Sequence, residues 1–119
     1  MQRKLLFIVF AEDACRQNHA LLYATDLKSK GHDVKLILEG AATRSVSRTG
    51  DTLLSSLLSE AKEKGILAGA CRKASGGCKP GDPNVLELAS AQSVPLLDDL
   101  QGHAGIADFV AQGYELVVI

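Results

Sequence analysis

The best candidates for chemistry in this chain are Cys71, Cys78 and His103. Each of them follows an apolar or glycine-rich segment, and Cys71 has the most informative neighbours. Cys71 comes directly after the apolar run at positions 65–70, and Arg72 and Lys73 follow it. Positive charge beside a cysteine stabilises the thiolate and lowers the pKa of the thiol. The sequence therefore predicts a reactive thiolate at Cys71, with Arg72 and Lys73 as its electrostatic support.

Two further residues could act with this thiol. Cys78 follows Gly76 and Gly77, and this glycine pair would let the chain turn back toward Cys71. Cys78 could then resolve an oxidised or persulfide state of Cys71 as a disulfide. His103 lies in a glycine-flanked loop and could donate or accept a proton. We therefore treat Cys71, Cys78 and His103 as catalytic candidates, although buried cysteines often act only as small apolar residues.

Strand-like and helix-like segments alternate along the chain. Glu12 and Asp13 precede the first helical segment, and Asp51 or Thr52 is expected to cap the second. The alternation predicts one α/β domain over residues 1–119, in three layers, with a five-stranded, mainly parallel sheet and helices on both faces, as in flavodoxin-like and Rossmann-like folds. The expected strands cover 5–11, 34–38, 66–70, 94–97 and 116–119; the expected helices cover 14–30, 52–64, 85–91 and 106–112, with a polar loop at 42–50.

The predicted topology brings separate parts of the sequence to one edge of the sheet. Ligands of such sheets bind beyond the carboxyl ends of the strands. Cys15 follows the first expected strand, Cys71 the third and His103 the fourth. We therefore expect these three residues at the same edge, with Cys15 and Glu12 as possible lining of the cleft.

Several known kinds of site do not fit the sequence. The turn after the first strand has no glycine and carries two acids, so it is unsuited to a dinucleotide, and a GxSxG nucleophile motif is also absent. A phosphorelay receiver would need an aspartate where Cys71 stands. Cys15, Cys71, Cys78 and His103 could converge on a metal, but the chain has no CxxC pair. We therefore expect no cofactor and no metal.

Composition narrows the range of partners and compartments. A net charge of −1 and an aromatic content of 4% argue against direct binding of nucleic acid. Three cysteines without a secreted-scaffold spacing indicate free thiols in a reducing compartment, so the cytoplasm is expected. The apolar run near the start is too short for a signal peptide, and no segment is long enough to cross a membrane.

Four segments of the chain resemble the DsrE/DsrF-like family, which includes sulfur-relay proteins of the TusD type. They are the opening strand at 4–11, the segment 31–40, the triplet Gly69-Ala70-Cys71 and the closing segment 113–119. The resemblance implies a small parallel α/β domain that assembles into trimers or hexamers. It also implies that the cysteine after the third strand, here Cys71, accepts a persulfide. Many members have a second cysteine three residues later, where this chain has Ala74.

Two functions remain open on the sequence. In the first, a donor protein loads sulfur onto Cys71 as a persulfide and an acceptor protein removes it. In the second, the chain is a non-catalytic oligomeric module that binds a small ligand or a protein at the strand ends. A metal-binding or redox-sensing protein is a more distant third reading, and whether the chain is an enzyme stays open.

Overall fold

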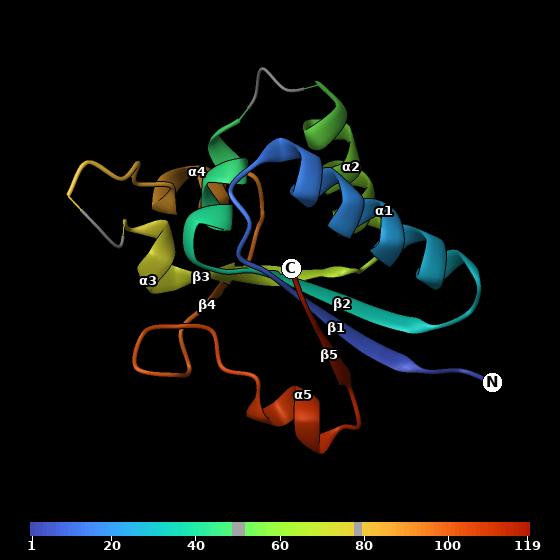
Figure 1. Cartoon of the computed structure of the whole chain (residues 1–119). Coiled ribbons are helices and arrows are strands. Elements are labelled where there is room, and N and C mark those ends of the chain that lie inside the picture. The colour runs from blue at the N-terminus through green and yellow to red at the C-terminus, as the bar shows by residue number, and fades with distance from the viewer. Residues whose placement is uncertain (49–51, 78–79) are drawn as a thin grey trace.

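The computed structural model of the chain describes residues 1–48, 52–77 and 80–119. Its strands are β1 (Lys4–Val9), β2 (Asp33–Leu38), β3 (Leu67–Cys71), β4 (Leu96–Leu97) and β5 (Glu115–Val118). Its helices are α1 (Ala14–Ser29), the 3₁₀ helix η1 (Gly40–Ser47), α2 (Thr52–Glu63), α3 (Arg72–Ser75), α4 (Leu86–Ala91) and α5 (Ala107–Ala111). These elements follow one another in the strand–helix alternation that the sequence predicts (Figure 1).

The five strands form one parallel sheet in the order β4-β3-β2-β1-β5. Strand β1 lies inside the sheet, and residues 5 to 9 of this strand are all buried. Leu5 and Phe7 pack on one face and Leu6 and Ile8 on the other, because successive side chains of a strand point to opposite sides. The predicted α/β fold, with a sheet covered on both faces, is therefore confirmed.

The two faces of the sheet are covered unequally. Helices α1, α2 and α4 lie over one face, and α5 lies under the other (Figure 1). None of the residues of α5 is buried, so this short helix covers little of its face. The smaller core on this second face has seven buried members: Leu6, Ile8, Ile37, Cys71, Ala74, Ala104 and Tyr114.

Several elements differ from the sequence prediction: β1 ends at Val9 instead of residue 11, and β4 covers only Leu96–Leu97 instead of 94–97. The expected loop at 42–50 is η1 over Gly40–Ser47, and Glu39 caps this helix by accepting a hydrogen bond from the Gly40 N–H. Cys71 ends β3 instead of beginning a loop, and it is followed at once by α3. The prediction that the acids at 12 and 13 open the first helix is confirmed for Asp13, which caps α1 because its carboxylate accepts from the Arg16 N–H. The expected cap Asp51 of the second helix lies outside the described residues.

Helix length and composition bear on membrane insertion. Across the described part of the chain, none of the helices combines the length and apolar character that crossing a bilayer requires.

Candidate functional site

Three neighbouring strands of the sheet each contribute one reactive side chain to a common point. Glu39 follows β2, Cys71 is the last residue of β3, and His103 lies in the connection from β4 to α5. The ligand atoms of these three side chains all lie within 4.8 Å of one another. The carboxyl ends of parallel strands meet at one edge, and this rule accounts for the meeting of Cys71 and His103 that the sequence predicts.

The thiol of Cys71 is enclosed. The residue has 0% exposure and belongs to the core on the α5 side of the sheet. Cys71 also caps α3, since its Sγ accepts a hydrogen bond from the Ala74 N–H at 3.4 Å. The hydroxyl of Ser75 donates to the Cys71 carbonyl oxygen at 2.7 Å and fixes the backbone beneath the thiol.

His103 belongs to the segment 98–106, and this segment covers the Cys71 thiol. The distance from Cys71 Sγ to His103 Nδ1 is 3.3 Å. Backbone bonds hold this segment in place: the Lys73 N–H donates to the Gly102 carbonyl at 3.0 Å, and the His103 N–H donates to Leu100 at 2.8 Å. The Gly105 N–H donates to the Asp99 carboxylate at 2.8 Å. The imidazole is thus positioned by a short, hydrogen-bonded lid over Cys71.

Glu39 is the member of the site that the sequence analysis missed. Its backbone N–H donates to the Val9 carbonyl at 2.9 Å, and its Oε1 accepts from the Gly40 N–H at 2.9 Å. Both bonds place the carboxylate at the end of β2, beside the end of β3. The strand-end rule applied to Cys71 and His103 would have found it, since Glu39 is the first residue after an apolar strand.

The prediction of a thiolate favoured by neighbouring cations is wrong. Burial raises the pKa of the Cys71 thiol, and the nearby Glu39 carboxylate raises it further, while the Ala74 N–H opposes the shift. Arg72 and Lys73 are exposed on the outside of α3, where they line a surface hollow with Gln101 and Gly102. Adjacency in sequence does not bring their charges to the thiol, because the Cys71 side chain points into the core.

The other predicted site residues lie elsewhere. Cys15 is exposed on α1, and its Sγ lies 3.7 Å from Nδ1 of His19 on the same helix. The carboxylate of Glu12 pairs with Arg44, 2.5 Å from the guanidinium Nη1. Neither residue belongs to the cluster around Cys71. Cys78 lies outside the described residues.

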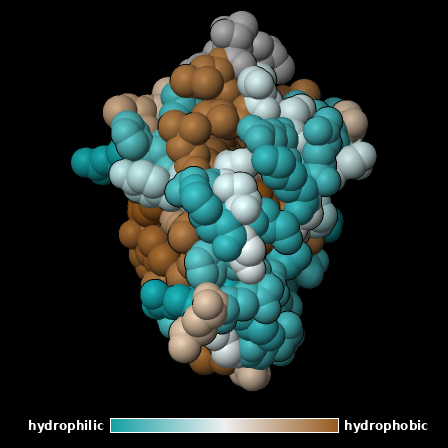
Figure 2. Space-filling view, turned by 90° about the vertical axis from the view of Figure 1, so that its right-hand side faces the viewer, coloured by the Kyte–Doolittle hydropathy of each residue, from teal (hydrophilic) through white to brown (hydrophobic). Residues whose placement is uncertain are grey.

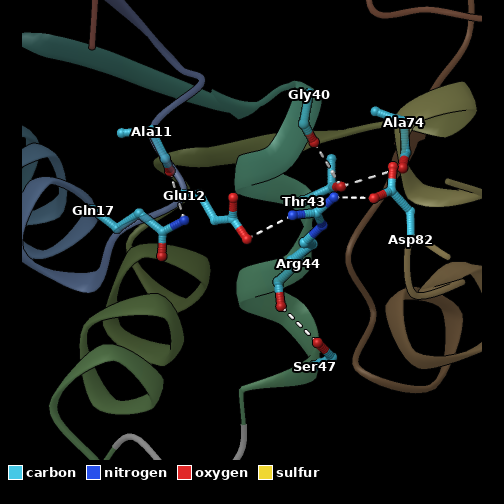
Figure 3. A network of polar contacts seen from close by, with 9 residues as sticks. All are labelled: Ala11, Glu12, Gln17, Gly40, Thr43, Arg44, Ser47, Ala74 and Asp82. Carbon is cyan, nitrogen blue, oxygen red and sulfur yellow. Dashed lines mark hydrogen bonds and ion pairs between the residues drawn. The ribbon is translucent and has the colours of Figure 1, made fainter. Parts of the chain in front are cut away.

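Ion pairs and hydrogen bonds of residues in η1 connect this helix to the segments around the site. Arg44 bridges Glu12 and Asp82, so it ties the segment after β1 to the segment before α4 (Figure 3). The hydrogen bond to Glu12 is the main reason that the pKa of Arg44 is raised, and the guanidinium therefore stays charged. The hydroxyl of the neighbouring Thr43 donates to the Gly40 carbonyl oxygen at 2.9 Å. The same hydroxyl lies 3.4 Å from the carbonyl oxygen of Ala74. The network thus fixes η1, and with it Glu39, against α3.

Comparison with known proteins shows a relative of this chain, but that relative has no assigned function. Over 43 residues the chain is 42% identical to a protein of Archaeoglobus fulgidus; the match spans 36% of this chain and 70% of the archaeal protein. The chain belongs to the same family as this archaeal protein. The relative is described only as an uncharacterized protein, so it assigns no role to Cys71 or its neighbours. No family model matches the chain, and no solved structure matches it.

Proposed function

We propose that this protein accepts sulfur as a persulfide on Cys71 and passes it to an acceptor protein. The observation that carries the proposal is the 3.3 Å approach of His103 Nδ1 to the Cys71 sulfur at the end of β3. An imidazole in contact with a thiol can take up its proton and activate it as a nucleophile. The resemblance of Gly69-Ala70-Cys71 to the strand-three cysteine segment of DsrE/DsrF-like proteins supports the same role.

The exchange needs neither an oxidant nor a cofactor. The thiol proton of Cys71 moves to His103, and the thiolate attacks the outer sulfur of a donor persulfide, R–S–SH. The new S–S bond forms as the donor S–S bond breaks, and the donor leaves as a thiolate that takes the proton from His103. The Ala74 N–H, 3.4 Å from Sγ, stabilises the sulfur anion during the transfer. Delivery to the acceptor is the same reaction in reverse.

Enclosure of Cys71 gives the unloaded carrier a resting state in which the thiol is shielded from solvent. Loading requires the segment 98–106 to move aside, because it carries His103 over the thiol. On the outer side of this lid, Arg72 and Lys73 line a hollow of about 340 Å³. We propose that a donor or acceptor protein docks there through acidic residues and displaces the lid. The free thiols of Cys15 and Cys71 suit a reducing compartment, and we propose that the protein acts in the cytoplasm.

Sulfur loading is expected to depend on Cys71. In the Cys15→Ser background, which removes the exposed thiol, treatment with a persulfide donor in the presence of a chelator should raise the intact mass by one sulfur atom. Cys71→Ser should abolish this gain, because the hydroxyl cannot form a persulfide. His103→Gln should slow loading by about 100-fold, the typical contribution of a positioned proton-transfer group.

Cys15→Ser provides the matched control for loading. Cys15 also lies beside a histidine, but it is exposed on α1 and outside the cluster. This variant should still gain one sulfur atom, on Cys71. A mass gain that persists in Cys71→Ser and disappears in Cys15→Ser would refute the proposal, and no gain at all would favour the binding module.

We also propose that the chain forms a homo-oligomer, a trimer or hexamer, through the β5 side of the sheet. Strand β5 is an edge strand, and Leu116 and Val118 are 42% and 63% exposed. They pair with Leu6 and Ile8 of β1 and so lie on the face that α5 covers poorly. The space-filling view shows hydrophobic surface open to solvent on the left-hand side of the molecule as it is turned there (Figure 2). A second copy would remove such surface from water.

A charge on the exposed edge should disrupt this assembly. Val118→Lys is expected to reduce the mass measured by light scattering to that of the monomer, because a lysine in a dry interface is costly to desolvate. The matched control is Leu53→Lys, which changes a residue of α2 that is 54% exposed. The control should keep the wild-type mass. A wild-type protein that is already monomeric at high concentration would refute the proposed assembly.

A further inference from the structure

The group of Glu39, Cys71 and His103 combines a carboxylate, a thiol and an imidazole. These are the three side-chain types that bind zinc in proteins. Their ligand atoms lie within 4.8 Å of one another, and the thiol is buried while the other two residues are half-buried. Zinc-like ions prefer such mixed sulfur, nitrogen and oxygen sets, whereas magnesium and calcium prefer oxygen alone.

The separations suit a common ion. Zinc bonds of about 2.3 Å to sulfur and about 2.05 Å to nitrogen, at a tetrahedral angle, put the two ligand atoms about 3.6 Å apart. Cys71 Sγ and His103 Nδ1 are 3.3 Å apart, so an ion could enter with a small outward movement of the lid. The Glu39 carboxylate lies within 4.8 Å of both other ligand atoms, and its side chain has three rotatable bonds with which to close the remaining gap.

We propose that Glu39, Cys71 and His103 bind one divalent ion of the zinc class and leave its fourth position open. Cys71 binds as the thiolate and its proton is released, so a thiolate and a carboxylate balance the two positive charges of the ion. Three protein ligands with an open position are the arrangement of zinc ions that take up an exogenous ligand.

The surroundings of the ligands already orient them for an ion. The Ala74 N–H donates to Cys71 Sγ at 3.4 Å, and the Gly40 N–H donates to Glu39 Oε1 at 2.9 Å. Such outer hydrogen bonds fix the direction of metal ligands and tune their strength. The sequence predicts no metal, since it lacks a CxxC pair. Here Glu39 and Cys71 lie at the ends of two strands and His103 lies in the connection after a third, so no local spacing in the sequence reveals the set.

Cys15 and His19 offer an internal comparison. They are also a thiol and an imidazole, with Sγ and Nδ1 3.7 Å apart, but both are exposed on α1. Among the described residues, no third ligand groups with them, whereas Glu39 completes the set at Cys71. The proposal therefore predicts that an ion binds at Cys71 and not at Cys15.

Cobalt(II) is the probe for the test, because a cobalt–thiolate bond has a near-ultraviolet charge-transfer band and four-coordinate cobalt has intense visible bands. Titration of the full chain, reduced and stripped of metal, should give both sets of bands with one equivalent per chain, and added zinc should abolish them. Cys71→Ser should lose the charge-transfer band. Glu39→Gln, which keeps the thiol, should retain the band with an affinity more than about 10-fold lower.

The double variant Cys15→Ser, His19→Gln is the matched control and should bind cobalt as the wild type does. Bands that vanish in this control, or a wild type without any charge-transfer band, would overturn the proposal. If Cys71→Ser fails to fold by circular dichroism, the drop in affinity of Glu39→Gln still decides the question. Metal binding does not rest on the proposed sulfur transfer, because the titration contains no persulfide donor and the loading assay contains a chelator.

One consequence does rest on the proposed function. An ion on the thiolate would occupy the sulfur that must attack the donor persulfide. Protein loaded with one equivalent of zinc should therefore gain no sulfur mass until the chelator is added. If protein that binds cobalt as described gains sulfur at the same rate with and without zinc, the ion and the persulfide do not share the Cys71 sulfur. That result would contradict the predicted block of sulfur loading.

Discussion

Gly69→Ala is expected to destabilise the fold by about 3 kcal/mol or more, through overpacking and backbone strain. A Cβ at this position would lie 2.5 Å from the Pro95 carbonyl oxygen and 2.9 Å from Leu97 Cγ. The φ angle of Gly69 is +157°, which residues with side chains rarely adopt. Because the Ala70 N–H donates to the same Pro95 oxygen at 2.8 Å, the added methyl group would force β4 away from β3. Urea denaturation measures the loss as a lower midpoint.

Gly76→Ala is the matched control for this substitution. Gly76 has a φ of −80° and a ψ of −4°, which alanine adopts freely, and its nearest contact for a new Cβ is 3.6 Å away. The midpoint should move by less than the equivalent of about 0.5 kcal/mol. Equal stability of the two variants would contradict the close approach of Pro95 to β3. Since Gly69 lies two residues before Cys71, Gly69→Ala should also impair cobalt binding and sulfur loading.

Alkylation of Cys71 at neutral pH is expected to be at least about 100-fold slower than alkylation of Cys15, which corresponds to a lid-opening free energy of about 2.7 kcal/mol. Cys15 is exposed, whereas Cys71 has 0% exposure and lies beneath His103. Burial, together with Glu39, also raises the pKa of the Cys71 thiol, so little thiolate is present at neutral pH. Peptide mass spectrometry after timed iodoacetamide treatment gives the rate at each cysteine.

Loosening the lid should accelerate this reaction. Asp99→Ala removes the acceptor of the Gly105 N–H, a bond to a charged group, and should raise the Cys71 rate by about 10-fold. Asp108→Ala removes an exposed acid of α5 and should leave the rate unchanged. Equal rates at Cys71 and Cys15 in the wild type would show that the thiol is open, and the protected resting state would then be withdrawn.

The sign of the accompanying pH effect follows from the raised pKa of Cys71. At alkaline pH the unfolded chain releases the thiol proton before the folded chain does, so the unfolded state binds fewer protons. The free energy of unfolding should therefore fall as the pH rises above the ordinary pKa of cysteine, about 8.5. Cys71→Ala should remove this part of the slope. Denaturation midpoints across that alkaline range measure the difference.

Several features of the site followed from the sequence alone. The continuous apolar stretch that begins at Leu5 predicted a strand buried on both faces, and the alternation of such runs with helical segments predicted a parallel sheet. The carboxyl-end rule then placed Cys71 near His103, which the 3.3 Å contact confirms. These inferences succeed because they depend on the order of elements and on burial, which are properties of residue type and spacing.

The tertiary structure decides where the side chains at the site point and which charged groups lie near the Cys71 thiol. Cys71 is the last residue of β3 and faces the core beside Glu39, whereas Arg72 and Lys73 belong to α3, and this helix turns both side chains outward. Cys15 follows β1 as predicted, yet the helix directs its thiol to His19. The sequence determined which residues reach the edge of the sheet. Strand order, register and side-chain direction determined which of them meet, because those depend on contacts between distant segments.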